Sequence, residues 1–293
     1  MLAVITFAVI HPLQLVAVPL ALLLIALPPR APSLVVVAVG LVVLAFLGPR
    51  GPLWYVEHGW TLLLGGWFVL AVLARPTASF VQRAVAAVGA TAVSAGAIIV
   101  LSGGWRELDW TIASHYRDVA EGLGRLWPGE GAGAETLVER AAELPALLFP
   151  ALLGVSSTAA LGVAWWVFRR VSPEARPLGR LPDFRFPDAW VWVLIGGLVL
   201  LLAPFGDGGS RLGSNLVFFM GTLYALRGLA VLVALIAATV GSQVVPLLVL
   251  GLIGLILYPI VIAGTLLLGV TDTWLDLRSG RREVNDGGRR SGR

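Results

Sequence analysis

The 293-residue chain is 58% hydrophobic and only 13% charged. Soluble domains carry about 25% charged residues, so this sequence has too few polar side chains to coat a water-soluble globule of its size. All 21 basic residues are arginines, and they gather at the ends of apolar segments and in residues 278–293, which favours a membrane surface over nucleic acid as their partner. Cysteine is absent, which excludes disulfides and sulfur-ligated metals.

Eight apolar blocks follow one another along the chain, and most are long enough to cross a bilayer, which takes about 20 apolar residues. They cover residues 2–27, 34–47, 53–74, 80–101, 144–168, 189–205, 216–240 and 244–270. The sequence therefore predicts an all-α, polytopic transmembrane helix bundle of eight spans. If one of the two short blocks, 34–47 or 189–205, does not cross, the number is seven.

The first block lacks the cationic start and the small-residue cleavage site of a secretory signal, so we expect a retained membrane helix. Pro12 and Pro19 lie within this block. Each proline removes a backbone hydrogen bond, so the sequence predicts a kinked helix.

Residues 104–143 differ from the rest because they carry charges of both signs. Apolar residues recur there at intervals of three and four, which predicts an amphipathic helix; they are Leu108, Ile112, Tyr116, Val119, Leu123 and Leu126. Nearby tryptophans favour an interfacial helix between spans four and five, and an extramembrane helix packed on the bundle is the alternative. A glycine-rich turn and a second short helix at 135–143 follow. We thus expect a membrane domain at 1–276 with this insert, and a basic, disordered tail at 277–293.

The orientation of the chain is predicted from arginine-rich segments, which usually face the cytoplasm. Residues 278–293 form one such segment, and the loop at 169–185 forms another. Because three predicted spans separate them, the two segments should lie on opposite sides. We expect the tail to be cytoplasmic and, with eight spans, the amino terminus as well.

Arg227 is a charge inside the apolar block 216–240. A charged side chain at mid-depth in a bilayer costs a few kcal/mol or more on insertion scales, so such residues usually face a cavity or a partner. The functional interpretation is an anion-coordinating or counter-ion site, and the structural alternative is an arginine paired with a carbonyl or carboxylate. Asn215 lies twelve residues earlier, at the entrance of the same span, where a helix cap is expected.

Asp272 and Asp276 are four residues apart, so they share a helix face just past the last span. Carboxylates near the carboxyl end of a helix oppose its macrodipole, which predicts compensating charges. We expect an interfacial ion-pair network with Arg278, Arg281 or an arginine of the basic loop, and a cation or docking site is the alternative.

Glu57 and His58 begin the third block beside aromatic residues, which is typical of an interfacial belt. A proton-relay pair is the functional alternative, and His11 could join it in a polar cavity. No motif for a metalloprotease, a serine nucleophile or a nucleotide-binding loop occurs. The sequence therefore predicts no enzyme, no catalytic residue, no metal and no cofactor.

Three motifs in the second half carry a resemblance: Leu-Pro-Asp-Phe at 181–184, Leu-Tyr-Ala-Leu-Arg-Gly-Leu-Ala-Val at 223–231, and Leu-Gly-Val-Thr-Asp-Thr-Trp-Leu-Asp-Leu-Arg at 268–278. Through them residues 145–278 resemble the YybS-like family of uncharacterised bacterial polytopic membrane proteins. That family is distantly similar to the S components of energy-coupling-factor vitamin transporters. The resemblance implies a small-molecule ligand and membrane partner subunits. Arg227 departs from the glutamine of the family, so no binding role is carried over to it.

In S components an alanine pair in the first helix contacts the coupling subunit, and Ala17 with Ala21 repeats that spacing. Two hypotheses follow for this chain in the bacterial inner membrane. The first is a protein that binds or transports a small solute in the manner of an S component, with His11, Glu57, His58, Asn215 or Arg227 in one cavity. The second is a non-transporting scaffold that recruits envelope or division partners, with those residues scattered to the interfaces.

Overall fold

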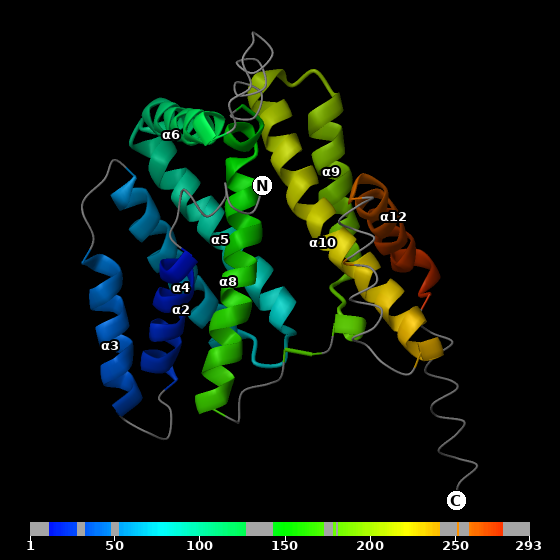
Figure 1. The fold of residues 1–293 in the computed structure, drawn as a ribbon, viewed down its shortest axis with the longest axis horizontal. Helices are drawn as coiled ribbons and strands as arrows, with labels where there is room; N and C mark the ends of the chain where they lie inside the picture. Colours follow the sequence, from blue (N-terminus) through cyan, green and yellow to red (C-terminus); the bar gives the residue numbers. More distant parts are fainter. Residues whose placement is uncertain are drawn as a thin grey trace, which may run out of the picture. The chain divides into compact units, whose positions relative to one another are not determined.

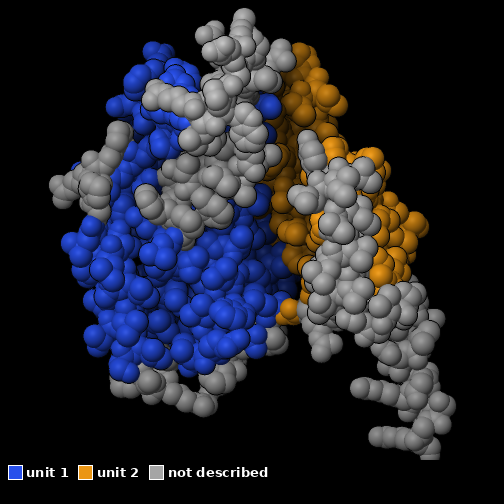
Figure 2. Space-filling view, viewed as in Figure 1, with its two compact units in different colours: residues 1–178 blue, residues 179–293 orange. Residues whose placement is uncertain are grey.

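The computed structural model describes residues 12–27, 33–47, 53–126, 143–172, 178–179, 181–240, 251 and 258–277. Within these ranges all regular secondary structure is helical. The chain divides into two compact units, residues 1–178 and 179–293, which Figure 2 distinguishes by colour. The all-α prediction is confirmed for the part of the chain that the structure describes.

The described part of unit 1 contains six long helices. They are α2 (Pro12–Ala26), α3 (Ser33–Phe46), α4 (Trp54–Ala74), α5 (Phe80–Leu101), α6 (Trp105–Leu126) and α8 (Phe149–Val171). The start of α5 is encoded locally by a capping box, in which Ser79 and Gln82 satisfy each other's backbone N–H groups. The turn after α5 uses Gly103 at φ +69°, a conformation that favours glycine.

The core of unit 1 is aromatic and lies where α4, α5 and α8 meet. Phe68 of α4 is fully buried, and its ring makes edge-on contacts with Phe80 at 6.0 Å and Trp165 at 5.9 Å. One polar contact joins α4 to α8, since the indole nitrogen of Trp60 donates to the hydroxyl of Ser157 at 2.9 Å. Such a bond holds two apolar helices in one register.

Helix α6 lies across one end of unit 1, as Figure 1 shows. It buries Ile112 and Tyr116, while Trp110 on another face is 68% exposed. This arrangement agrees with the amphipathic helix expected in the insert, and α6 is not among the helices apolar enough to cross a membrane. Burial raises the pKa of Tyr116 to about 12, because an apolar site disfavours the phenolate.

Unit 2 begins with two short 3₁₀ turns, η1 (Leu181–Asp183) and η2 (Asp188–Trp190). Three long helices follow among the residues that the structure describes. These are α9 (Val191–Leu202), α10 (Gly206–Val240) and α12 (Tyr258–Leu275). At 1.5 Å per residue the 35 residues of α10 extend about 52 Å, well beyond the roughly 30 Å of a bilayer core. Helix α10 is therefore the element on which the rest of the unit is assembled.

Both α9 and α12 pack closely on α10, but along different stretches of it. A Cβ built on Gly213 of α10 would lie 2.5 Å from the backbone nitrogen of Leu201, near the end of α9. Farther along α10, a Cβ on Gly228 would lie 1.7 Å from the carbonyl oxygen of Thr265 in α12. The segment just before α9 and the carboxyl-terminal part of α12 meet at α10, because Arg227 of α10 bonds to Asp188 and to Asp272.

Among the described residues, four helices are long and apolar enough to cross a membrane: Trp54–Ala74, Phe80–Leu101, Phe149–Val171 and Gly206–Ile236. Four shorter apolar helices accompany them, Leu13–Ala26, Ser33–Phe46, Asp188–Leu202 and Pro259–Leu275. The expected membrane helices are thus present, although the structure does not establish eight crossings. The predicted second short helix at 135–143 lies almost wholly outside the described residues.

One predicted boundary was wrong by ten residues. Helix α10 begins at Gly206 rather than at residue 216, because the polar stretch from Asp207 to Asn215 is helical as well. The predicted start of the last block, at 244, lies outside the described residues, and within that block the structure describes α12 from Tyr258. Apolarity marks where a helix can meet lipid, and it does not mark where the backbone hydrogen bonds start.

Candidate functional site

A glycine-to-glycine crossing brings α10 and α12 into backbone contact. A Cβ on Gly269 would lie 1.9 Å from the carbonyl oxygen of Tyr224, and one on Gly228 would meet the backbone of α12 at 1.7 Å. No side chain larger than hydrogen fits at either position without moving the helices apart. This close approach brings the residue that precedes Gly228, Arg227, against the carboxyl-terminal turns of α12.

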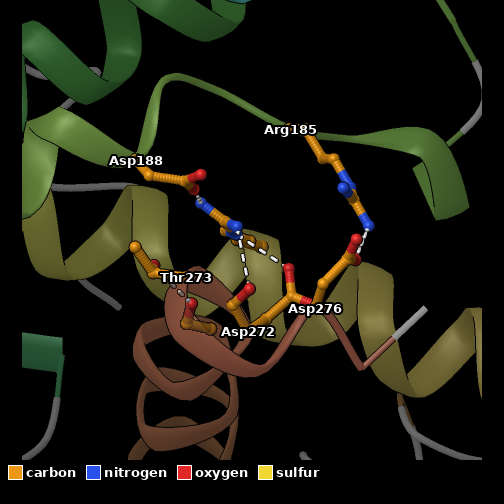
Figure 3. A network of polar contacts seen from close by, with 7 residues as sticks. Arg185, Asp188, Asp272, Thr273 and Asp276 are labelled. Atoms are coloured by element: carbon orange, nitrogen blue, oxygen red, sulfur yellow. Dashed lines mark hydrogen bonds and ion pairs between the residues drawn. The ribbon is translucent and has the colours of Figure 1, made fainter. Parts of the chain in front are cut away.

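Arg227 is held by three hydrogen bonds from two other elements, as Figure 3 shows for the cluster around it. Its Nε donates to Asp272 Oδ2 at 2.9 Å, and its Nη2 donates to the Asp272 backbone carbonyl at 3.1 Å. Its Nη1 donates to Asp188 Oδ1 at 2.8 Å. Arg227 thus joins α10 to α12 and to η2.

The burial of these charges differs sharply along the cluster. The side chains of Arg227 and Asp272 are 3% and 0% exposed, whereas that of Asp188 is 63% exposed. A buried ion pair requires good geometry and further hydrogen bonds, because both charges lose their hydration. The Arg227–Asp272 pair is therefore buried, whereas the Asp188 carboxylate that also bonds Arg227 is exposed.

Aromatic rings cover the guanidinium group of Arg227. Its Cζ lies 5.4 Å from the centre of the Phe186 ring, within the range of a cation–π contact. Phe186 is itself fixed by Trp190, stacked at 5.4 Å, and by Tyr224, edge-on at 5.0 Å. The short segment from Phe186 to Asp188 therefore provides both a carboxylate and an aromatic cover for Arg227.

Arg185 and Asp276 form a second ion pair beside the first one, and both are partly exposed. Asp276 follows the last residue of α12 and has φ +37°, so the chain turns there. The carboxylates at 272 and 276 thus pair with different arginines, Arg227 and Arg185. Arg278 lies outside the described residues.

The second ion pair joins two segments that the sequence predicted to lie on opposite sides. Arg185 ends the basic loop and Asp276 precedes the tail, yet their side chains are in contact. The prediction counted three spans between these segments, and residues 241–250 and 252–257 of the last one lie outside the described residues.

Asn215 does not cap a helix, contrary to the expectation. It lies nine residues inside α10, where its Nδ2 donates to the backbone carbonyl of Arg211 at 2.8 Å. Twelve residues of helix, about 18 Å, separate it from Arg227 along the axis. Asn215 and Arg227 therefore do not belong to one cluster.

Glu57 and His58 lie in the first turns of α4, in unit 1. His58 is 3% exposed and contacts two backbone carbonyls, and Glu57 is half-buried. His11 lies outside the described residues. The structure thus places the proposed ligand-binding residues in two separate units, and each unit holds its own polar cluster.

Ala17 and Ala21 are 8% and 0% exposed, so they pack inside unit 1. This contradicts a docking role for the pair, because neither side chain is available to a partner. The close approach of α2 to α4 depends on Gly65, where a Cβ would lie 3.2 Å from the Cα of Pro19.

Asp188 and Phe186 were missed by the sequence analysis. Both lie in a polar, proline-containing stretch before α9 that seemed to be a connecting loop. A search for an acidic partner of Arg227 would have offered Asp188 as one of several candidates. Among the residues that the structure describes, no group of three His, Asp or Glu side chains is arranged to hold a metal ion.

The sequence matches the model of a protein family described as "Predicted membrane protein (DUF2232)" over residues 1–273. The chain belongs to this family. No curated protein and no solved structure matches it. Membership agrees with the four long apolar helices, and the family match covers both units and every residue of the cluster except Asp276.

Proposed function

We propose that this family member binds a small, positively charged solute at the cluster formed by Arg227, Asp272 and Asp188. The observation that carries the proposal is the buried pair of Arg227 and Asp272, 2.9 Å apart, which joins two apolar helices, α10 and α12. Apolar residues of similar size would usually stabilise such a contact as well or better. Charged groups retained at such a place usually serve a ligand, an ion or a proton.

The charge balance of the cluster favours a cation over an anion. Arg227 gives its Nε, Nη1 and Nη2 hydrogen bonds to protein oxygens, so little of its charge is left for an anionic ligand. The two carboxylates outnumber this single arginine, which leaves a formal charge of −1. The counter-ion interpretation of Arg227 is therefore preferred here to the anion-coordinating one.

Asp188 is the group that would meet the solute. Arg227 holds one carboxylate oxygen of Asp188, and the side chain is 63% exposed. A protonated amine or an inorganic cation could approach it without breaking the buried pair. Resemblance to S components supports a small-solute role, and active transport would then require separate ATP-hydrolysing subunits in a bacterial cell membrane.

The test is a thermal-shift screen of the full-length protein in detergent against inorganic cations and small amines. We expect at least one of them to stabilise the wild type and to bind Asp188→Asn at least tenfold more weakly. Asp183→Asn is the matched control, since Asp183 is an exposed aspartate in the same segment and should bind as the wild type does. A wild type that no compound stabilises, or an Asp188→Asn variant that binds equally well, would contradict the proposal.

The competing proposal is a non-transporting scaffold that recruits envelope or division partners. Helix α6 favours it, because Trp105 and Trp110 are 44% and 68% exposed on a helix that is not a membrane span. Removal of residues 280–293 should then abolish the capture of partners by the purified protein. Unchanged capture would argue against a role for the tail in such a scaffold.

A further inference from the structure

Helices α4 and α8 run in the same direction through unit 1, so their carboxyl ends lie at one end of it. Two contacts fix this direction, because Trp60 donates to Ser157 and, farther along both helices, the ring of Phe68 meets that of Trp165. The turn after α4 leads directly into α5, so the amino end of α5 lies there as well. Helix α6 lies at the opposite end, where Tyr116 contacts the first residue of α8 (Figure 1).

The two ends of unit 1 carry different charges. All six acidic residues that the structure describes in unit 1 belong to the end with α6. Glu57 and Glu143 lie near the starts of α4 and α8, and α6 itself has four acidic residues and three arginines. The other end, which we call the arginine end, has no acidic residue among those described, and it holds four arginines: Arg75, Arg83, Arg169 and Arg170.

The last turns of α8 change from apolar to charged along one face. Val163, Trp166 and Arg170 are spaced by three and four residues, so they share that face. Val163 and Trp166 are 50% and 47% exposed, and the Cζ of Arg170 lies 4.5 Å from the centre of the Trp166 ring. Apolar residues meet the bilayer core, tryptophans prefer the headgroup layer, and arginines extend to the membrane surface. This face of α8 therefore has the order of side chains expected where a span leaves a bilayer.

The end of α4 shows a similar order. Leu70 and Leu73 are 51% and 54% exposed, and Arg75, which follows the last residue of α4, is exposed as well. Arg83 differs because it is buried and donates to the carbonyls of residues 76 and 78, so it holds the turn between α4 and α5. At the surface of the arginine end Arg75 and Arg170 are exposed, and Arg169 is half-buried.

We propose that the arginine end of unit 1 binds the headgroups of anionic phospholipids through Arg75, Arg169 and Arg170, and that this end faces the cytoplasmic leaflet. The surface of that leaflet is negatively charged and attracts arginines beside membrane helices. Arginine-rich ends of spans lie on the cytoplasmic side of membranes in general. The end with α6 then lies at the opposite surface. The proposal stands on unit 1 alone, so it is independent of solute binding at Arg227.

The arginine-rich tail is compatible with this orientation. Arg185, at the end of the basic loop, pairs with Asp276, which immediately precedes the tail. The tail therefore begins beside the end of the loop that starts with Arg169 and Arg170. One cytoplasmic side can hold both arginine-rich segments of the sequence.

The first test titrates phosphatidylglycerol, and separately the zwitterionic phosphatidylcholine, into the full-length protein in a neutral detergent and follows the Tm. We expect phosphatidylglycerol to stabilise the wild type more than phosphatidylcholine does. The double variant Arg169→Gln with Arg170→Gln should bind phosphatidylglycerol roughly 25-fold more weakly, about fivefold for each arginine. The matched control is Arg106→Gln with Arg117→Gln on α6, which removes the same charge from the other end and should bind as the wild type does.

Three outcomes would overturn lipid binding at the arginine end. They are equal stabilisation of the wild type by both lipids, an equal loss of affinity in the control, and unchanged affinity in the Arg169 and Arg170 double variant. The last outcome, with a lower Tm in every lipid, would show that these two arginines only complement the dipole of α8. If the double variant does not fold, Arg75→Gln replaces it, with an expected loss of about fivefold.

The second test determines the orientation by chemical labelling. The chain has no cysteine, so a single introduced cysteine reports one position. Thr77→Cys lies in the turn at the arginine end and Ser102→Cys in the turn after α5, and both positions are exposed. We expect a membrane-impermeant maleimide to label only Ser102→Cys in spheroplasts and only Thr77→Cys in inside-out vesicles. The reverse pattern would refute the orientation.

Discussion

The buried Arg227–Asp272 pair allows a prediction in which two damaging substitutions compensate each other. Arg227→Met leaves the carboxylate of Asp272 without its counter-ion at a position that is 0% exposed. Removing one partner of a buried pair costs about 3–5 kcal/mol, because the remaining charge is neither hydrated nor paired. For a chain of this size that loss lowers the Tm by roughly 6–20 °C. Asp272→Leu should lower it similarly, since it leaves the guanidinium buried.

The double variant, Arg227→Met with Asp272→Leu, should recover most of that loss. It places two apolar side chains in an apolar interior, where replacement of a buried pair is often neutral or stabilising. Asp188 also loses its partner, but its side chain is 63% exposed and remains hydrated. We therefore expect the double variant to lie within about 2 kcal/mol of the wild type.

The assay is reversible unfolding in mixed micelles followed by tryptophan fluorescence, for which the chain offers 11 tryptophans. Wild type, both single variants and the double variant form a thermodynamic cycle, and its interaction free energy is the measured quantity. If the losses of the two single variants simply add in the double variant, the residues are not coupled and the pairing argument is refuted. A large interaction free energy, with the double variant more stable than the sum of the two losses predicts, supports the pairing argument.

Two further predictions concern other parts of the chain. Gly228→Ala should destabilise the protein by about 1–3 kcal/mol or more in the same unfolding assay, because its Cβ would lie 1.7 Å from the carbonyl oxygen of Thr265. Gly221→Ala on the same helix is the control and should be neutral or stabilising, since its Cβ would meet only Leu266 at 3.9 Å. Burial raises the pKa of Tyr116 to about 12, so the folded chain holds this proton while the unfolded chain loses it near the usual value of 10.0. Stability should therefore fall as the pH rises from about 10 to about 12, and Tyr116→Phe should lose this pH dependence in unfolding measurements; an unchanged dependence would contradict the assignment.

The helices of unit 1 could be predicted closely from local sequence. The block at 80–101 coincides with α5, whose start is specified by the capping box of Ser79 and Gln82. The α4 helix begins one residue after the predicted block at 53–74. Polar segments separate these helices, so apolarity and helix length agree there. In unit 2, α10 is longer than its apolar block because its first residues are polar. Helical hydrogen bonding continues through polar residues as readily as through apolar ones.

The residues of the candidate site also divide into those that the sequence predicted and those that it did not. Arg227 stood out because a charge in an apolar block is rare, and Asp272 stood out because a carboxylate opposes the carboxyl end of a helix. Asp188 and Phe186 gave no such signal, since a charge or a ring in a polar loop is ordinary. Their role depends on a non-helical segment that folds back onto α10 and α12.

The sequence by itself determined that the chain belongs in a membrane and which segments form its apolar helices. The reason is that the free energy of placing side chains in lipid or water depends mainly on composition and on the length of each apolar run. It also determined that Arg227 needed a partner. Tertiary structure decided which partner that was, and it paired Arg185 at the end of the basic loop with Asp276 before the tail. Both depend on how Gly228 and Gly269 let α12 cross α10, and the spacing of apolar residues along one chain carries no information about such a contact between distant segments.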